Sequence, residues 1–202
     1  YDETFVRLIL GDSYVNMTLN NIDNDDPMAV YKSSHQVSMF MGITVNNIFV
    51  SFKVFAYGVV LSIGTAWVLV SNGIMLGAFQ FFFFQQGLLI ESMLVIWIHG
   101  TIEIASIIIA GSAGLVMGNS ILFPNTYTRL ESFKRGANKG LKIIIGIVPL
   151  FIIAGFLESF ITRLTDMPAF LKLLIILGSA AGLVFYCWIY PIRLQRKTAT
   201  EA

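Results

Sequence analysis

The chain has 202 residues, of which 56% are hydrophobic and only 12% are charged. Soluble domains carry about 25% charged residues, so this composition excludes a soluble globular fold. A formal net charge of +1 gives no field that would attract nucleic acid, and the single cysteine, Cys187, excludes an internal disulfide and a cysteine metal cluster. We therefore expect an all-α, polytopic transmembrane helix bundle whose main partner is the lipid bilayer.

Residues 1–45 differ from the rest of the chain. Acidic residues crowd the first 26 positions, and Asn24-Asp25-Asp26-Pro27 predicts a turn. We expect an aqueous acidic segment with short interfacial helices at 5–10 and 30–43. The chain opens without a methionine or a signal-peptide pattern, so a further segment is expected to precede it.

Five apolar stretches follow the acidic segment. A bilayer core about 30 Å thick needs roughly 20 residues per helix. The predicted spans are 46–70, 73–90, 100–122, 141–162 and 170–191. The membrane bundle therefore covers 46–191, and 192–202 forms a basic tail. Asn72-Gly73 is expected to make the tight turn between the first two spans.

Lysine and arginine predict the orientation, because loops rich in them stay in the cytoplasm. The loop between the third and fourth predicted spans carries Arg129, Lys134, Arg135 and Lys139. More basic residues follow the fifth span. We expect this loop and the C-terminus to be cytoplasmic, and residues 1–45 to lie outside.

Small residues four positions apart let helix backbones approach closely in lipid. Three predicted spans carry such faces: Gly73/Gly77, Ala110/Gly114/Gly118 and Gly178/Gly182. They predict a compact bundle, and any face left over predicts a homodimer. Pro149 should kink the fourth span, because proline lacks an N–H and clashes with the preceding turn.

Ionisable residues inside spans are costly, at roughly 2.5–3.5 kcal/mol each at a helix centre on insertion scales. Counting along the spans places Lys53, His99, Glu103 and Glu158 within about two turns of the outer boundary. Glu91 is a candidate neighbour. His99 and Glu103 stand at i and i+4, so they share a helix face.

Three readings of this intramembrane cluster stay open. It is a structural group that pairs its own charges, or a route or binding site for protons, ions or a lipid headgroup. Metal-dependent hydrolysis is the third reading, but it would need a second histidine, and only the remote His35 is left. Nucleophile-elbow and phosphate-loop motifs are missing, so we expect no enzyme, metal or cofactor.

Several motifs together resemble one family. They are Asn46-Asn47, Asn72-Gly73-x-x-x-Gly77, His99-Gly100-Thr101-Ile102-Glu103, Ala110-Gly111-Ser112-Ala113-Gly114-Leu115, and Ala154-Gly155-Phe156-Leu157-Glu158-Ser159-Phe160-Ile161-Thr162. In this order, over about residues 14–190, the chain resembles the stage II sporulation protein M family of prokaryotic integral membrane proteins.

The resemblance implies a non-enzymatic, multi-span scaffold. The founding sporulation role implies a membrane anchor that recruits cell-wall hydrolases, so the expected partners here are other membrane or envelope proteins. We expect the bacterial cytoplasmic (inner) membrane as its location. Family members usually carry one more N-terminal span, which agrees with a missing upstream segment. The alternative is a transporter or channel-like permease that uses the His/Glu/Lys cluster.

Overall fold

The computed structural model describes residues 3–32 and 35–201, and within these ranges it contains helices and turns but no strand. The α-helices are α1 (Glu3–Leu10), α2 (Asp12–Asp23), α3 (Gln36–Ala56), α4 (Ile63–Gln85), α5 (Leu89–Leu122), α6 (Arg129–Phe156), α7 (Ala169–Val184) and α8 (Tyr190–Glu201). Two short 3-10 helices, η1 (Ala29–Lys32) and η2 (Tyr57–Val59), and two π-helical turns, η3 (Leu157–Ile161) and η4 (Phe185–Ile189), complete the chain. The all-α class is confirmed.

Five helices in the described residues are long and apolar enough to cross a membrane. They cover Gln36–Val59, Ile63–Gln85, Leu89–Leu122, Arg129–Ile161 and Ala169–Thr198. The predicted number of spans is therefore confirmed.

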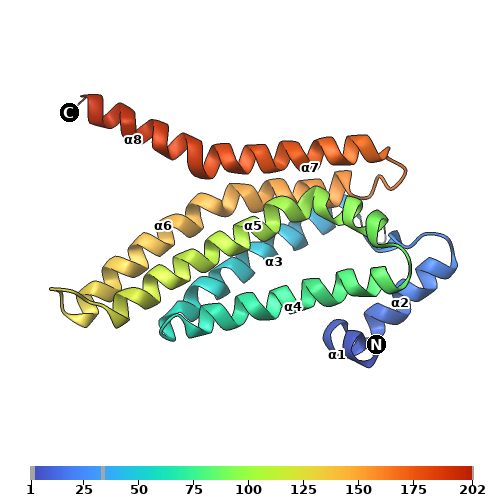
Figure 1. Cartoon of the computed structure of the whole chain (residues 1–202), viewed down its shortest axis with the longest axis horizontal. Helices are drawn as coiled ribbons and strands as arrows, with labels where there is room; N and C mark the ends of the chain where they lie inside the picture. The colour runs from blue at the N-terminus through green and yellow to red at the C-terminus, as the bar shows by residue number, and fades with distance from the viewer. Residues whose placement is uncertain (1–2, 33–34, 202) are drawn as a thin grey trace.

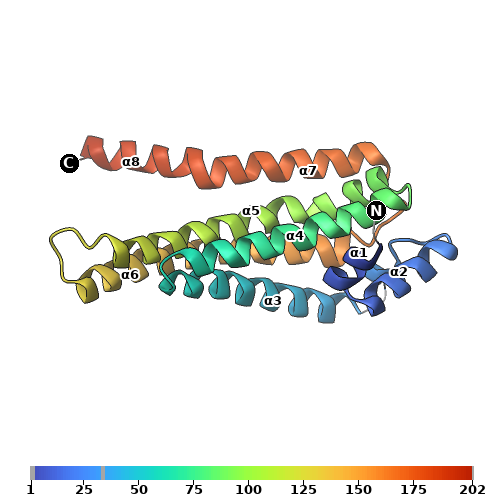
Figure 2. The ribbon, with the colours of Figure 1, turned by 60° about the horizontal axis from the view of Figure 1, so that its bottom comes forward.

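The long helices run side by side around α5 (Figures 1 and 2). Helices α3, α4, α6 and α7 all contact α5. At one end, which we call the N-terminal end, α1 and α2 lie beside the tip of α4 (Figure 1). At the other end the α5–α6 hairpin protrudes beyond the connection between α3 and α4 (Figure 1). We call this the hairpin end.

Two hydrophobic cores hold this arrangement. One lies between α3, α5 and α6 and includes Val54, Ala113 and Phe151. The other joins the N-terminal helices to the end of α4 through residues such as Val15 and Phe82. The acidic N-terminal segment is therefore packed onto the bundle.

The predicted boundaries of the first two spans are wrong. Helix α3 begins at Gln36 instead of 46, and the chain reverses at 57–62 instead of at Asn72-Gly73. The reversal uses positive φ angles at Leu61 (50°) and Ser62 (67°). Non-glycine residues adopt this left-handed region rarely, so the sequence carries no turn signal there.

Asn72 lies in the middle of α4 and not in a turn. Its Nδ2 donates a hydrogen bond of 2.8 Å to the carbonyl of Val68, one turn earlier. This bond satisfies the amide within the helix, which is why a typical turn residue is tolerated at that position.

Only one of the three predicted small-residue faces is a helix contact. On α5, a Cβ at Gly114 would lie 2.9 Å from the carbonyl oxygen of Val54 and would also meet the Thr65 hydroxyl. Gly118 likewise lies against the α3–α4 connection. The glycines on the other two faces have open space at the Cβ position: Gly73, Gly77, Gly178 and Gly182.

Helix α5 has 34 residues, so at 1.5 Å per residue it is about 51 Å long, against a bilayer core of about 30 Å. Helix α6 contains Pro149 and continues into the π-helical turn η3. A π-helical turn adds a residue to one turn and so shifts the following side chains around the helix axis. Glu158 lies on η3.

Candidate functional site

Three ionisable side chains meet inside the bundle: His99 and Glu103 from α5, and Glu158 from η3. One ligand atom from each lies within 4.8 Å of the other two. Nε2 of His99 is 3.9 Å from Oε1 of Glu158. His99 is 6% exposed, and the side chain of Glu158 is 16% exposed. We call these residues the His–Glu cluster.

Polar and aromatic neighbours surround the His–Glu cluster. Nδ1 of His99 and the hydroxyl of Thr162 share a hydrogen bond of 3.0 Å. The side chain of Asn47 on α3 lies beside Glu103. Asn47 is 5% exposed, and its Nδ2 has no hydrogen-bond partner in the described part of the chain. Elements far apart in sequence thus converge on one polar site.

Tyr31 of η1 covers the cluster from the N-terminal end. Its ring meets the His99 imidazole edge-on, with centroids 5.9 Å apart and an interplanar angle of 63°. Burial, and then the nearby Glu158, raise the pKa of the Tyr31 phenol well above its usual value. Tyr31 was not predicted as a site residue, because only tertiary packing brings position 31 beside position 99.

Lys53 does not join the cluster, and this part of the prediction is wrong. It is exposed in the last turn of α3, six residues beyond Asn47, or about 9 Å along the helix. Because α3 begins at Gln36 instead of 46, Lys53 lies near the end of the span instead of near its start. Glu91 also lies apart, in the first turn of α5.

The motif positions of the family lie in four kinds of place. Asn47 and Thr162 lie in the cluster, and Gly114 lies at the contact of α5 with α3 and α4. Asn46 is exposed on α3. The remaining motif positions, Asn72, Gly73 and Gly100, line a cavity next to the cluster.

This cavity, of about 310 Å³, lies between α4 and α5. His99 and Glu103 contribute to its wall, while isoleucines and leucines line most of the rest. A second cavity of about 320 Å³ shares Met75, Leu76 and Ile96 with it and reaches Tyr14 and Tyr31. The His–Glu cluster is therefore accessible from the α4–α5 side.

Among the described residues, neither Glu103 nor Glu158 has a lysine or arginine as an ion-pair partner. The partner that the sequence suggested, Lys53, is too far away. A buried carboxylate without such a partner is stable only when it is protonated or holds a cation.

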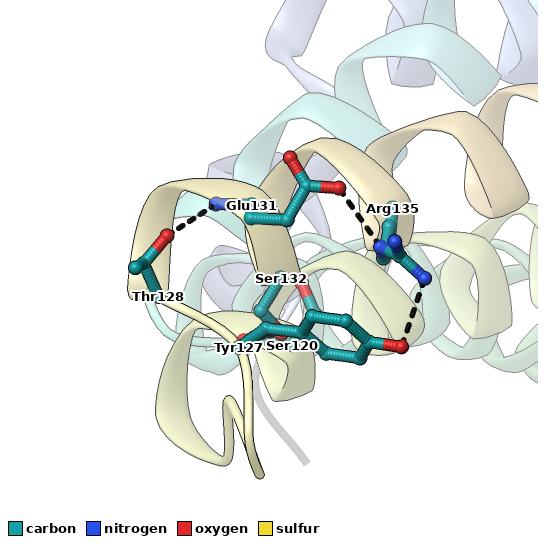
Figure 3. Close-up of polar contacts among 6 residues, drawn as sticks. All are labelled: Ser120, Tyr127, Thr128, Glu131, Ser132 and Arg135. Atoms are coloured by element: carbon teal, nitrogen blue, oxygen red, sulfur yellow. Dashed lines mark hydrogen bonds and ion pairs between the residues drawn. The ribbon is translucent and has the colours of Figure 1, made fainter.

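A second candidate site is the tip of the α5–α6 hairpin (Figure 3). Thr128 caps α6 by accepting a hydrogen bond of 3.4 Å from the Glu131 N–H. Arg135 donates to Glu131 at 2.9 Å and to the Tyr127 hydroxyl at 3.0 Å. Its guanidinium also lies 4.0 Å from the centre of the Tyr127 ring. These contacts give the hairpin tip a defined shape.

The predicted basic loop is in fact a helical surface. The connection between α5 and α6 is limited to 123–128, and all four predicted basic residues lie on the first turns of α6. They are exposed: Arg129, Lys134, Arg135 and Lys139. On the facing side of the hairpin, Ser132 donates a hydrogen bond of 2.7 Å to the Ser120 carbonyl, which holds the two helices together.

A bundle with five helices able to cross a bilayer, and with ionisable side chains gathered between them, defines an integral membrane protein. The sequence model of the stage II sporulation protein M family matches residues 5–163, and the chain belongs to this family. No curated protein and no solved structure matches the chain. The matched range contains the whole His–Glu cluster and ends before α7.

Proposed function

We propose that this protein is a non-enzymatic component of the bacterial inner membrane that assembles other membrane or envelope proteins. The observation that carries the proposal is the α5–α6 hairpin, which extends beyond the α3–α4 connection (Figure 1) and carries the exposed basic residues of α6. Basic surfaces of membrane proteins stay in the cytoplasm. The hairpin and the C-terminus then face the cytoplasm, and α1 and α2 face outside.

The fifth span supports the same proposal. Only 6% of an 18-residue apolar stretch of this span, Ala169–Thr198, is buried inside the structure, compared with 44% of the corresponding stretch of α5. Its glycines Gly178 and Gly182 have open space at the Cβ position. Small residues on an exposed transmembrane face permit close approach of another helix, from a second copy of this chain or from a different protein.

Copurification tests the scaffold proposal. We expect proteins bound to the full chain in mild detergent to be lost from the double variant Lys134→Glu with Lys139→Glu. The matched control replaces both lysines with arginine, which keeps the charge on the same exposed helix surface. If the arginine and glutamate variants retain the same bound proteins, the hairpin is not the assembly surface and the proposal loses its main support.

A permease is the second candidate function, because a cavity reaches His99 and Glu103 from the α4–α5 side. Such a cavity is the feature that a packed structural cluster would lack. In this reading the carboxylates bind the ion, proton or lipid headgroup that moves.

The replacements Glu103→Gln and Glu158→Gln separate the two candidates. A scaffold whose cluster holds the bundle together should lose folding or bound partners. A permease should keep normal assembly but lose ion or lipid movement when reconstituted in vesicles. Glu91→Gln, an exposed glutamate on the same helix as Glu103, serves as the matched control in both measurements.

A further inference from the structure

The His–Glu cluster has the spacing of a metal site. An imidazole nitrogen and one oxygen from each of two carboxylates lie within 4.8 Å of one another. The 3.9 Å between His99 Nε2 and Glu158 Oε1 is too long for a hydrogen bond. Two ligands of a tetrahedral zinc ion lie about 3.3–3.6 Å apart when each is about 2.0–2.2 Å from the metal. The other pairs of ligand atoms lie up to 4.8 Å apart, and rotation of the glutamate side chains would bring them closer together.

The charge of the cluster also fits a divalent cation. With His99 neutral and both glutamates ionised, the cluster carries two negative charges inside a transmembrane bundle. The described lysines and arginines form no salt bridge with either glutamate. A single divalent cation would cancel both charges and remove the cost of burying them.

The neighbours of the cluster resemble the supporting groups of known metal sites. A histidine ligand usually holds its second ring nitrogen in a hydrogen bond, which fixes the ring orientation. Thr162 makes this bond to Nδ1 of His99 and leaves Nε2 directed at Glu158. The buried side chain of Asn47, beside Glu103, can donate its Nδ2 hydrogens to a carboxylate oxygen or to a water bound with the ion.

We propose that His99, Glu103 and Glu158 bind one divalent transition-metal ion, with Zn²⁺ as the best fit. Imidazole suits zinc and related metals, whereas Mg²⁺ and Ca²⁺ prefer six or more oxygen ligands. Three protein ligands leave a fourth position free. The cavity of about 310 Å³ adjoins His99 and Glu103, so it offers space for a water or a small ligand at that position.

The test uses the full chain purified in detergent and stripped of metal by a chelator. Calorimetric titration with Zn²⁺ should give one saturable site per chain, and Co²⁺ should give the absorption bands of a low-coordinate nitrogen–oxygen site. His99→Ala and Glu103→Gln should each weaken Zn²⁺ binding by at least about 100-fold. Thr162→Val, which leaves all three ligands in place, should weaken it by about 10- to 100-fold.

Glu91→Gln is the matched control and should bind Zn²⁺ as the unchanged protein does. X-ray absorption of the Co²⁺-loaded unchanged protein should show one histidine ligand, and this measurement does not depend on the folding of any variant. The proposal is overturned if no saturable binding occurs, if His99→Ala and Glu103→Gln bind normally, or if Mg²⁺ binds as tightly as Zn²⁺. Binding of partner proteins plays no part in these measurements, so their outcome is independent of the scaffold proposal.

Discussion

At the scale of single residues, the sequence shows which side chains are unusual but not which of them meet. His99 and Glu103 could be paired by their spacing on one helix, because positions i and i+4 share a face. The prediction that Glu158 lies near His99 and Glu103 depends on the order and direction of the predicted spans. The predicted position of Lys53 is wrong because α3 begins at Gln36 and not at 46. Tyr31 carries no signal in the sequence, since its position depends on how η1 folds over the bundle.

Tyr14 provides a test of how tightly the N-terminal segment packs. Burial raises the pKa of its phenol from 10.0 to about 12. Between these two pH values the unfolded chain loses the phenol proton while the folded chain keeps it, so stability falls as the pH rises through this window. We call this fall in stability the alkaline loss. Phenylalanine has no phenol proton, so we expect Tyr14→Phe to reduce the alkaline loss by up to about 2 kcal/mol.

Thermal unfolding of the detergent-solubilised protein, followed from about pH 9 to about pH 12, measures the effect of Tyr14→Phe. The matched control is Tyr127→Phe, at an exposed tyrosine on the hairpin, which should show the alkaline loss of the unchanged protein. Equal alkaline losses in Tyr14→Phe and in the unchanged protein would mean that α2 does not bury Tyr14 in solution.

At the scale of helices, composition and length predicted the fold class and the number of spans, because lipid allows few alternatives to apolar helices about 20 residues long. The first two spans were displaced for a physical reason. Residues 36–85 are apolar on both sides of the true reversal, and a left-handed Leu61-Ser62 turn resembles a helix interior in sequence. The predicted turn at Asn72-Gly73 is therefore wrong, because this polar pair lies inside α4.

The glycines give a second test at this scale, because α4 and α5 carry them in different surroundings. Gly114→Ala places a methyl group 2.9 Å from the Val54 carbonyl oxygen, so the backbones of α3 and α5 must separate. We expect a loss of about 1–3 kcal/mol. Gly77→Ala meets nothing within 4 Å and should be neutral or slightly stabilising, because alanine favours a helix.

Unfolding midpoints of the two glycine variants, measured by fluorescence-detected size exclusion after heating, compare them directly. Both changes add the same methyl group to a transmembrane glycine, so a difference between them reports the contact and not the composition. A Gly77→Ala variant as unstable as Gly114→Ala would show that α4 packs against a helix of another molecule.

At the scale of the whole molecule, an odd number of spans predicts that the segment before α3 and the segment after the fifth span lie on opposite sides of the membrane. The proposed orientation is testable with single cysteines introduced into a Cys187→Ser background. A cysteine at the exposed Asp23 should react with an impermeant maleimide in intact cells. A cysteine at the exposed Lys134 should react only after the inner membrane is opened. The reverse pattern of labelling would invert the topology and remove the basis for a cytoplasmic hairpin.

The small buried fraction of the fifth span bears on how the protein is assembled. Among the described residues of α7, only Lys172 is buried, and it hydrogen-bonds at 3.0 Å to the Thr165 carbonyl of the preceding loop. In chain order, α7 follows every residue of the His–Glu cluster. We therefore expect the four preceding spans to bring the cluster residues together before α7 packs against α5. We expect the exposed face of α7 to exchange lipid neighbours for protein ones while its contact with α5 is kept.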